Sequence, residues 1–187
     1  MTGVQTCALP IWARPVLQPA LAVLAILGAG AGVVVRWRAV EAGVGASLTT
    51  GFDEDPFGVA AQGIMLVIGL LAVLVMADRT TADDGAFAAQ AADRPGSAEE
   101  AESLHAGWTG TEVFPLTLFS LGGMMLFPLS SNLIALFVML ELVSLPLYIM
   151  AAMARHRRLL SQEAALKYFV LGAFASAFLL MGAALLY

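Results

Sequence analysis

Charged residues are scarce in this chain of 187 residues: they make up only 12%, against roughly 25% in an ordinary soluble domain. Hydrophobic residues make up 60%, and the mean hydropathy is +0.86. These values exclude a soluble globular domain. The scarcity is also local, because five long apolar stretches hold only two charged residues, Glu141 and Lys167. This pattern is typical of a polytopic membrane protein.

Cysteine is nearly absent, since Cys7 is the only one, and the chain therefore forms no internal disulfide. Residues 1–11, which include Cys7, resemble the conceptual translation of a sequencing-adapter oligonucleotide, so we exclude them from the fold reasoning. We accordingly expect the gene to begin further upstream and the chain to be an internal fragment. The net charge of −5 arises in residues 78–111, which hold seven acidic residues and two arginines. With no basic patch in the sequence, we expect no nucleic-acid partner.

Five apolar segments are long enough to cross a lipid bilayer, for which a helix needs about 20 residues, or about 17 at the short end. We therefore predict an all-α polytopic membrane protein with five transmembrane helices. Two spans fall in residues 12–77 and three in residues 112–187, while the acidic segment 78–111 is predicted to be a flexible loop. The predicted spans are residues 16–35, 57–77, 113–129, 133–154 and 164–187.

The basic residues predict how the chain is oriented in the membrane. Four of them in a row, at 155–158, directly follow the fourth span, so the loop 155–163 is predicted to be cytoplasmic. Counting back along the spans makes the loop 78–111 cytoplasmic as well. Arg36 and Arg38 then lie on the outer side of the membrane, in mild conflict with the positive-inside rule, by which basic loops are cytoplasmic.

Glu141 is the first candidate functional residue. It lies eight residues into its predicted span, which places it about 12 Å deep in a hydrocarbon core of about 30 Å. A carboxyl group there is expected to face the bundle interior, where desolvation favours its protonated form. Such a group can exchange a proton when a neighbouring charge changes. The alternative is a permanently protonated side chain that hydrogen-bonds between helices.

Ser144 and Pro146, which follow Glu141 in the same span, are predicted to support it. Ser144 follows it by three positions on the same helix face and could donate a hydrogen bond to the carboxylate. Pro146 leaves the carbonyl of Leu142 without its helical donor and permits a kink. For this proline a purely structural kink is an equally good interpretation.

Lys167 is the second ionisable residue within a predicted span. Glu163 precedes it by four positions, and position alone favours a snorkelling lysine in a helical ion pair. The functional interpretation is a cationic stop on a proton path. The glycines of residues 28–32, and the pair Gly172 and Ser176, are predicted to be sites of helix packing. No metal-ligand cluster, nucleophile triad or phosphate loop stands out.

Residues 140–148, LELVSLPLY, and 161–169, SQEAALKYF, resemble the antiporter-like membrane subunits of the proton-pumping NADH-quinone oxidoreductase, respiratory complex I. The likeness extends through residues 171–178 and covers the chain from about residue 112 to the end. The sibling subunits and the multisubunit sodium/proton antiporters usually have an aromatic residue just before the equivalent glutamate. Met139 and Leu140 stand there in this chain, which favours the N-type subunit.

The resemblance implies an antiporter-like fold built from inverted repeats, of which this chain carries part of the first. It also implies a subunit that couples quinone reduction to proton pumping through buried Glu and Lys charges. Glu141 and Lys167 are then the translocation residues, with Ser144 and Pro146 in support. The family's broken helix, which carries the lysine partner of the glutamate, is not in this stretch. We therefore expect no activity from the stretch alone.

As a part of complex I, the chain is expected to be a non-redox subunit of the enzyme in the cell inner membrane. Its partners are then the lipid bilayer and the other membrane subunits. It is expected to bind no cofactor itself, while the complex uses NADH and quinone. Two alternatives remain open: a subunit of a multisubunit cation/proton antiporter, and a non-transporting membrane scaffold protein.

Overall fold

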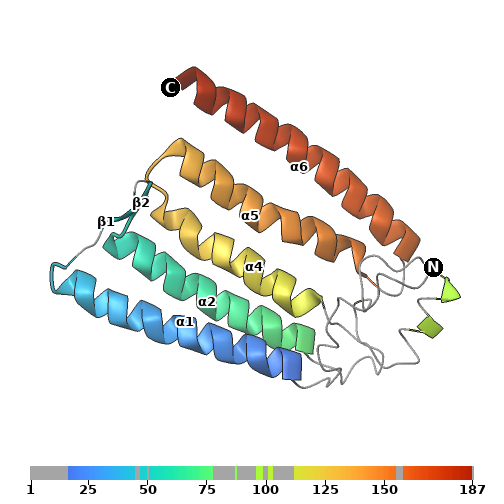
Figure 1. The fold of residues 1–187 in the computed structure, drawn as a ribbon, viewed down its shortest axis with the longest axis horizontal. Helices are drawn as coiled ribbons and strands as arrows, with labels where there is room; N and C mark the ends of the chain where they lie inside the picture. The colour runs from blue at the N-terminus through green and yellow to red at the C-terminus, as the bar shows by residue number, and fades with distance from the viewer. Residues whose placement is uncertain are drawn as a thin grey trace, which may run out of the picture.

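In the part of the chain that the structure describes, five long antiparallel helices lie in a row, each packed against the next in chain order (Figure 1). The structure is a computed structural model that describes residues 17–44, 47–49, 51–77, 87, 96–98, 101–102, 112–154 and 158–186. Residues 1–11 and most of the loop 78–111 therefore lie outside the described residues. The helices are α1 (Leu17–Glu41), α2 (Pro56–Ala77), α4 (Val113–Leu126), α5 (Leu133–Ala152) and α6 (Arg158–Leu186), and a short 3-10 helix, η1 (Phe127–Leu129), extends α4.

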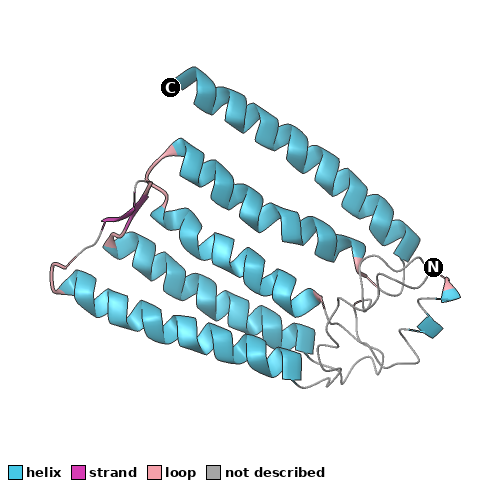
Figure 2. Cartoon of the chain, in the orientation of Figure 1, coloured by secondary structure: helices cyan, strands magenta, loops and turns pink. Residues whose placement is uncertain are grey.

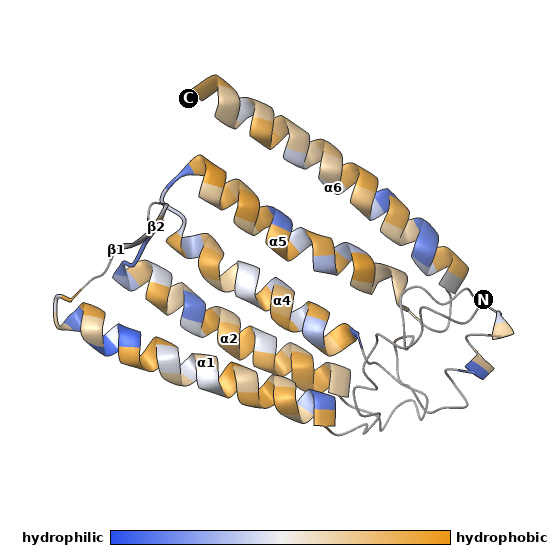
Figure 3. Cartoon of the chain, viewed as in Figure 1, coloured by the Kyte–Doolittle hydropathy of each residue, from blue (hydrophilic) through white to orange (hydrophobic). Residues whose placement is uncertain are grey.

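Four of these helices, α1, α2, α5 and α6, are long and apolar enough to cross a membrane. The third predicted span corresponds to α4 and η1 together, which form a shorter apolar segment from Val113 to Leu129. Large hydrophobic side chains cover the outer surface of the helices, among them Leu24, Val75 and Phe174, and Figure 3 shows the apolar colouring along each one. A surface of this kind is stable in lipid and not in water. The chain is therefore a multi-pass membrane protein.

Two helices extend beyond the apolar runs that predict them. Helix α1 continues past Val35 through a polar turn to Glu41, and α6 begins at Arg158, inside the predicted loop 155–163. Arginine, lysine and glutamate are good helix formers, so the backbone hydrogen bonds continue where the apolar run stops. Apolar length predicts the part of a helix that lies in the membrane, but it does not predict where the helix ends.

The fold also contains a small β-hairpin, visible in Figure 2, that the all-helical prediction did not include. Strands β1 (Ser47–Thr49) and β2 (Phe52–Asp53) pair antiparallel, and Gly51 between them has a φ of +111°. The carbonyl of Gly51 accepts a hydrogen bond of 2.9 Å from the backbone N–H of Ser131. The hairpin therefore ties the α1–α2 connection to the start of α5. Strands this short carry too little alternation to be predicted from sequence.

An ion pair holds the same end of the bundle. Arg36 of α1 donates through Nε to both carboxylate oxygens of Glu54, at 3.1 and 2.9 Å, and Nη2 makes a further contact. The Glu54 side chain is only 6% exposed. One of the two arginines that conflict with the positive-inside rule is thus paired with a buried carboxylate.

Glycines on α2 bring α4 close. A Cβ on Gly69 would lie 2.6 Å from a methyl group of Leu121, in the buried cluster that α1, α2 and α4 share. The glycines of α1 behave differently from the prediction. A Cβ added at Gly28, Gly30 or Gly32 would meet no atom within 4 Å in the described part of the chain. Their predicted packing role is therefore not fulfilled by the helices described.

Candidate functional site

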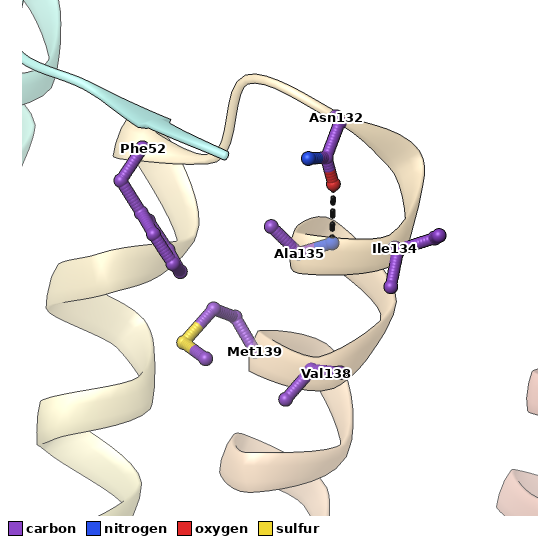
Figure 4. Close-up of a pocket in the computed structure, with 6 residues that line it drawn as sticks. All are labelled: Phe52, Asn132, Ile134, Ala135, Val138 and Met139. Atoms are coloured by element: carbon purple, nitrogen blue, oxygen red, sulfur yellow. Dashed lines mark hydrogen bonds between the residues drawn. The ribbon is translucent and has the colours of Figure 1, made fainter. Parts of the chain in front are cut away.

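Helix α5 begins with a side-chain cap that fixes its first turn. The Oδ1 atom of Asn132 accepts a hydrogen bond of 2.7 Å from the backbone N–H of Ala135, which satisfies one of the free donors at the helix start. A groove of about 240 Å³ lies beside this turn, between the hairpin and α5 (Figure 4). It is lined by Phe52, Asn132, Ile134, Ala135, Val138 and Met139. Five of its six lining residues are apolar, Asn132 being the exception, and Glu141 is not among the six.

The carboxyl group of Glu141 is the unusual feature of α5. Its Oε1 atom is buried and has no hydrogen-bond partner in the described part of the chain. The residue lies eight positions after the helix start, about 12 Å along the axis, with apolar residues on both sides in the sequence. A buried polar atom without a partner costs about 1–3 kcal/mol, so natural proteins rarely retain one without a role.

Ser144 does not support Glu141 in the way the sequence predicts. Its hydroxyl donates a hydrogen bond of 2.7 Å to the carbonyl of Leu140 in its own helix. The predicted hydrogen bond from Ser144 to the carboxylate is therefore wrong for this structure. A serine within a helix readily bonds back to the carbonyl four residues earlier, and residue spacing cannot distinguish the two acceptors. Pro146 lies within α5 as predicted, and it is buried.

Helix α4 contacts α5 one to two residues after Glu141. The Ser120 hydroxyl of α4 donates a hydrogen bond of 3.1 Å to the carbonyl of Val143. A Cβ on Gly123 would lie 3.0 Å from the backbone nitrogen of Val143 and 3.2 Å from the carbonyl carbon of Leu142. Sequence reasoning missed both residues. The available signal was a serine and a glycine, three positions apart, in an otherwise apolar run.

Helix α6 packs against α5 through an aromatic contact. Tyr148 is 8% exposed, and its ring meets those of Tyr168 and Phe169 edge-on, with centroid distances of 4.7 and 5.6 Å. Its hydroxyl lies over Gly172, where a Cβ would be 1.8 Å away, so the predicted packing role of this glycine is confirmed. Glu141 precedes Tyr148 by seven residues, or two helical turns, and so lies on the same face, toward α6.

Lys167 is not brought to Glu141. Its Nζ atom lies 2.6 Å from Oε1 of Glu163, and the two side chains are 70% and 59% exposed. The predicted helical ion pair is confirmed. The residues of α6 that are buried near α5, such as Ser161 and Ala165, lie on another face of the helix from Lys167. The exposed lysine and the buried carboxyl therefore occupy different environments.

Two other buried polar groups of the bundle have partners on neighbouring helices. Gln62 of α2 donates a hydrogen bond of 3.1 Å to the carbonyl of Met125 in α4. Thr117 of α4 donates to its own helix at Val113, at 2.8 Å, and lies 3.4 Å from the sulfur of Met150. Among the residues described, no group of three or more His, Cys, Asp or Glu residues could hold a metal ion.

A half-buried glutamate, with its Oε1 atom buried, in a row of apolar helices agrees with the result of family comparison. The family model described as "NADH:quinone oxidoreductase/Mrp antiporter, TM" matches residues 130–187, a range that contains Glu141 and Lys167. A solved structure, respiratory complex I from Thermus thermophilus with bound Aureothin, contains a chain with the same fold. The TM-score is 0.64 at 28% sequence identity, over 92% of this chain and 31% of that one. The class is thus the antiporter-like membrane subunits.

Curated relatives narrow this class further. NADH-quinone oxidoreductase subunit N from Beutenbergia cavernae is 48% identical over 182 residues, which cover 93% of this chain and 34% of the relative. The protein of the same name from Acidothermus cellulolyticus is 59% identical over 126 residues, which cover 67% of this chain and 24% of the relative. The protein of that name from Saccharopolyspora erythraea is 46% identical over 182 residues, which cover 96% of this chain and 35% of the relative. The chain belongs to the NADH-quinone oxidoreductase subunit N family, and it spans about a third or less of the length of these relatives.

Proposed function

We propose that the subunit to which this chain belongs translocates protons in NADH-quinone oxidoreductase, and that Glu141 gains and releases the proton. One observation carries the proposal: Oε1 of Glu141 is buried in a membrane-spanning helix and has no hydrogen-bond donor among the residues that the structure describes. The alternative role, a permanent interhelical hydrogen bond, is not formed by that oxygen within the described helices. Ionisable groups at such depth are costly and usually serve transport.

The proposed mechanism is electrostatic. Quinone reduction elsewhere in the complex changes a charge near Glu141, and this change favours either the ionised or the protonated carboxyl. Lys167, held by Glu163 on the exposed side of α6, is proposed as a secondary cationic stop. Pro146 supports the site by leaving one carbonyl of α5 without a helical donor. Ser144 supports it through its bond to the Leu140 carbonyl.

We further propose that all five apolar segments span the membrane and form part of an inverted-repeat fold. The segment from Val113 to Leu129 has about 25 Å of length, slightly less than a core of about 30 Å, so it needs local thinning of the bilayer. The basic residues at 155–158 favour a cytoplasmic side for the loops 155–163 and 78–111, and we propose that the hairpin lies on the outer side. The membrane is proposed to be the cell inner membrane.

The proposed partners are the lipid bilayer and other membrane subunits of complex I, with no nucleic acid. This chain is proposed to be a non-redox subunit that binds no flavin, iron–sulfur cluster or NADH, because the redox chemistry with NADH and quinone takes place elsewhere in the complex. The relatives support this assignment through their shared name, NADH-quinone oxidoreductase subunit N.

The test is Glu141→Gln in the subunit assembled with the rest of the complex, because this change removes the titrating group and keeps its volume. We expect proton pumping in inverted membrane vesicles to be abolished or sharply reduced at unchanged complex content. Glu41→Gln serves as the control, since Glu41 is exposed and lies at the end of α1. Normal pumping with Glu141→Gln would contradict the proposal and favour a scaffold.

A cation/proton antiporter subunit is the second candidate, because the matched family model covers both groups. Transport that depends on sodium, in a protein that does not copurify with quinone reductase subunits, would identify it. Pumping that depends on quinone reduction and not on sodium would exclude it.

A further inference from the structure

Helix α5 lacks a hydrogen bond at Pro146, and α4 packs against it near that point. Because Pro146 has no N–H, the carbonyl four residues earlier has no helical donor. The next carbonyl, that of Val143, accepts a hydrogen bond of 3.1 Å from the Ser120 hydroxyl. Gly123 lies against the preceding peptide, which joins Leu142 to Val143, and a Cβ on Gly123 would be only 3.0 Å from the Val143 nitrogen. Helix α4 therefore contacts the backbone of the turn that follows Glu141.

Among the described residues, no hydrogen-bond partner fixes the direction of the Glu141 carboxyl. Oε1 accepts no hydrogen bond from the residues described, and Ser144 on the same face donates to Leu140 instead. The direction of the carboxyl therefore depends on how the α5 backbone is rotated about the helix axis. Leu142 and Val143, which α4 contacts, follow Glu141 directly in the chain. A rotation of this turn moves the carboxyl with it.

We propose that Ser120 and Gly123 of α4 are positioning residues for Glu141. The hydroxyl holds the carbonyl of Val143, and the glycine lets the two backbones approach; together they fix the rotation of the α5 turn. This inference rests on the proposed role of Glu141 in proton translocation. Neither residue needs to touch the proton, because both act through the backbone of α5.

The experiment uses two pairs of variants in the subunit assembled in its complex. Gly123→Ala pushes against Val143, whereas Gly122→Ala is the matched control, because a Cβ at Gly122 meets no atom within 4 Å. Ser120→Ala removes the donor to Val143, whereas Ser120→Thr keeps a hydroxyl. The readouts are protons pumped per NADH oxidised in inverted vesicles, the rate of quinone reduction, and the complex content of the membrane.

Gly123→Ala and Ser120→Ala are expected to lower the ratio of protons to NADH by roughly twofold or more at unchanged complex content, because a sub-ångström misplacement of a reacting group slows its reaction. Gly122→Ala and Ser120→Thr are expected to keep the wild-type ratio. A purely structural role would lower the complex content and leave the ratio of the assembled complex unchanged.

The proposal is overturned if Ser120→Ala keeps the wild-type ratio, or if Ser120→Thr loses as much as Ser120→Ala. If Gly123→Ala prevents assembly, the Ser120 pair still decides the outcome. Glu141→Gln separates this inference from the proposed function. Full pumping in Glu141→Gln contradicts the proposed function itself. If Glu141→Gln loses pumping but the Ser120 and Gly123 variants keep the wild-type ratio of protons to NADH, only the positioning role is contradicted.

Discussion

Replacing Gly172 with alanine should disrupt the contact between α5 and α6. A Cβ on this residue would lie 1.8 Å from the hydroxyl oxygen of Tyr148 and 2.6 Å from the ring carbon that bears it. The ring has little freedom to turn away, because it is buried and packs edge-on against Tyr168 and Phe169. The hydroxyl must retreat by roughly 2 Å to reach an ordinary van der Waals contact. Overpacking of this kind costs about 1–3 kcal/mol.

The assay is the midpoint temperature at which the detergent-solubilised complex loses this subunit. We expect Gly172→Ala to lower that midpoint and Gly182→Ala to leave it unchanged, since a Cβ at Gly182 meets no atom within 4 Å. Adding Tyr148→Leu to Gly172→Ala removes the clashing ring, so the double variant should lose less than the sum of the two single variants. Strictly additive losses, or a Gly172→Ala variant as stable as Gly182→Ala, would refute the packing argument.

Two further predictions concern α5 and α6. Asn132→Ala removes the cap on the N–H of Ala135 and should destabilise α5 by about 1 kcal/mol, whereas Asn132→Asp should retain stability; the same midpoint measurement compares them. Lys167→Ala should reduce proton pumping less than Glu141→Ala, because the Lys167 side chain is 70% exposed and its ion-pair partner Glu163 is exposed as well. Equal losses in vesicle pumping assays would show that Lys167 is central to the path.

The sequence predicted those features that depend on a single helix. The four longest helices follow from apolar length, and the pair of Lys167 with Glu163 follows from a spacing of four residues. The depth of Glu141 in its helix follows from the same counting. Ser144 shows where this reasoning fails, since its hydroxyl could reach two acceptors and spacing alone did not identify Leu140 as the one used.

The roles of Ser120 and Gly123 could not be predicted in this way, because each depends on which residue of α5 lies opposite. The hydrogen bond to Val143 joins residues 23 positions apart, and no local pattern fixes that register. The hairpin contact between Phe52 and Ser130 is also between distant segments. The physical reason is that these contacts depend on side-chain packing between separate segments.

Hydropathy and helical periodicity are properties of neighbouring residues. By themselves they determined that this chain crosses a membrane and that Glu141 lies well inside one of the apolar helices. Only the tertiary structure decided that Oε1 of Glu141 has no donor among the described residues, that Lys167 lies away from it, and that α4 contacts the α5 turn that follows Glu141. These outcomes depend on the rotation of each helix about its axis and on its register against its neighbours. Packing sets both, through glycines and aromatic rings contributed by different helices.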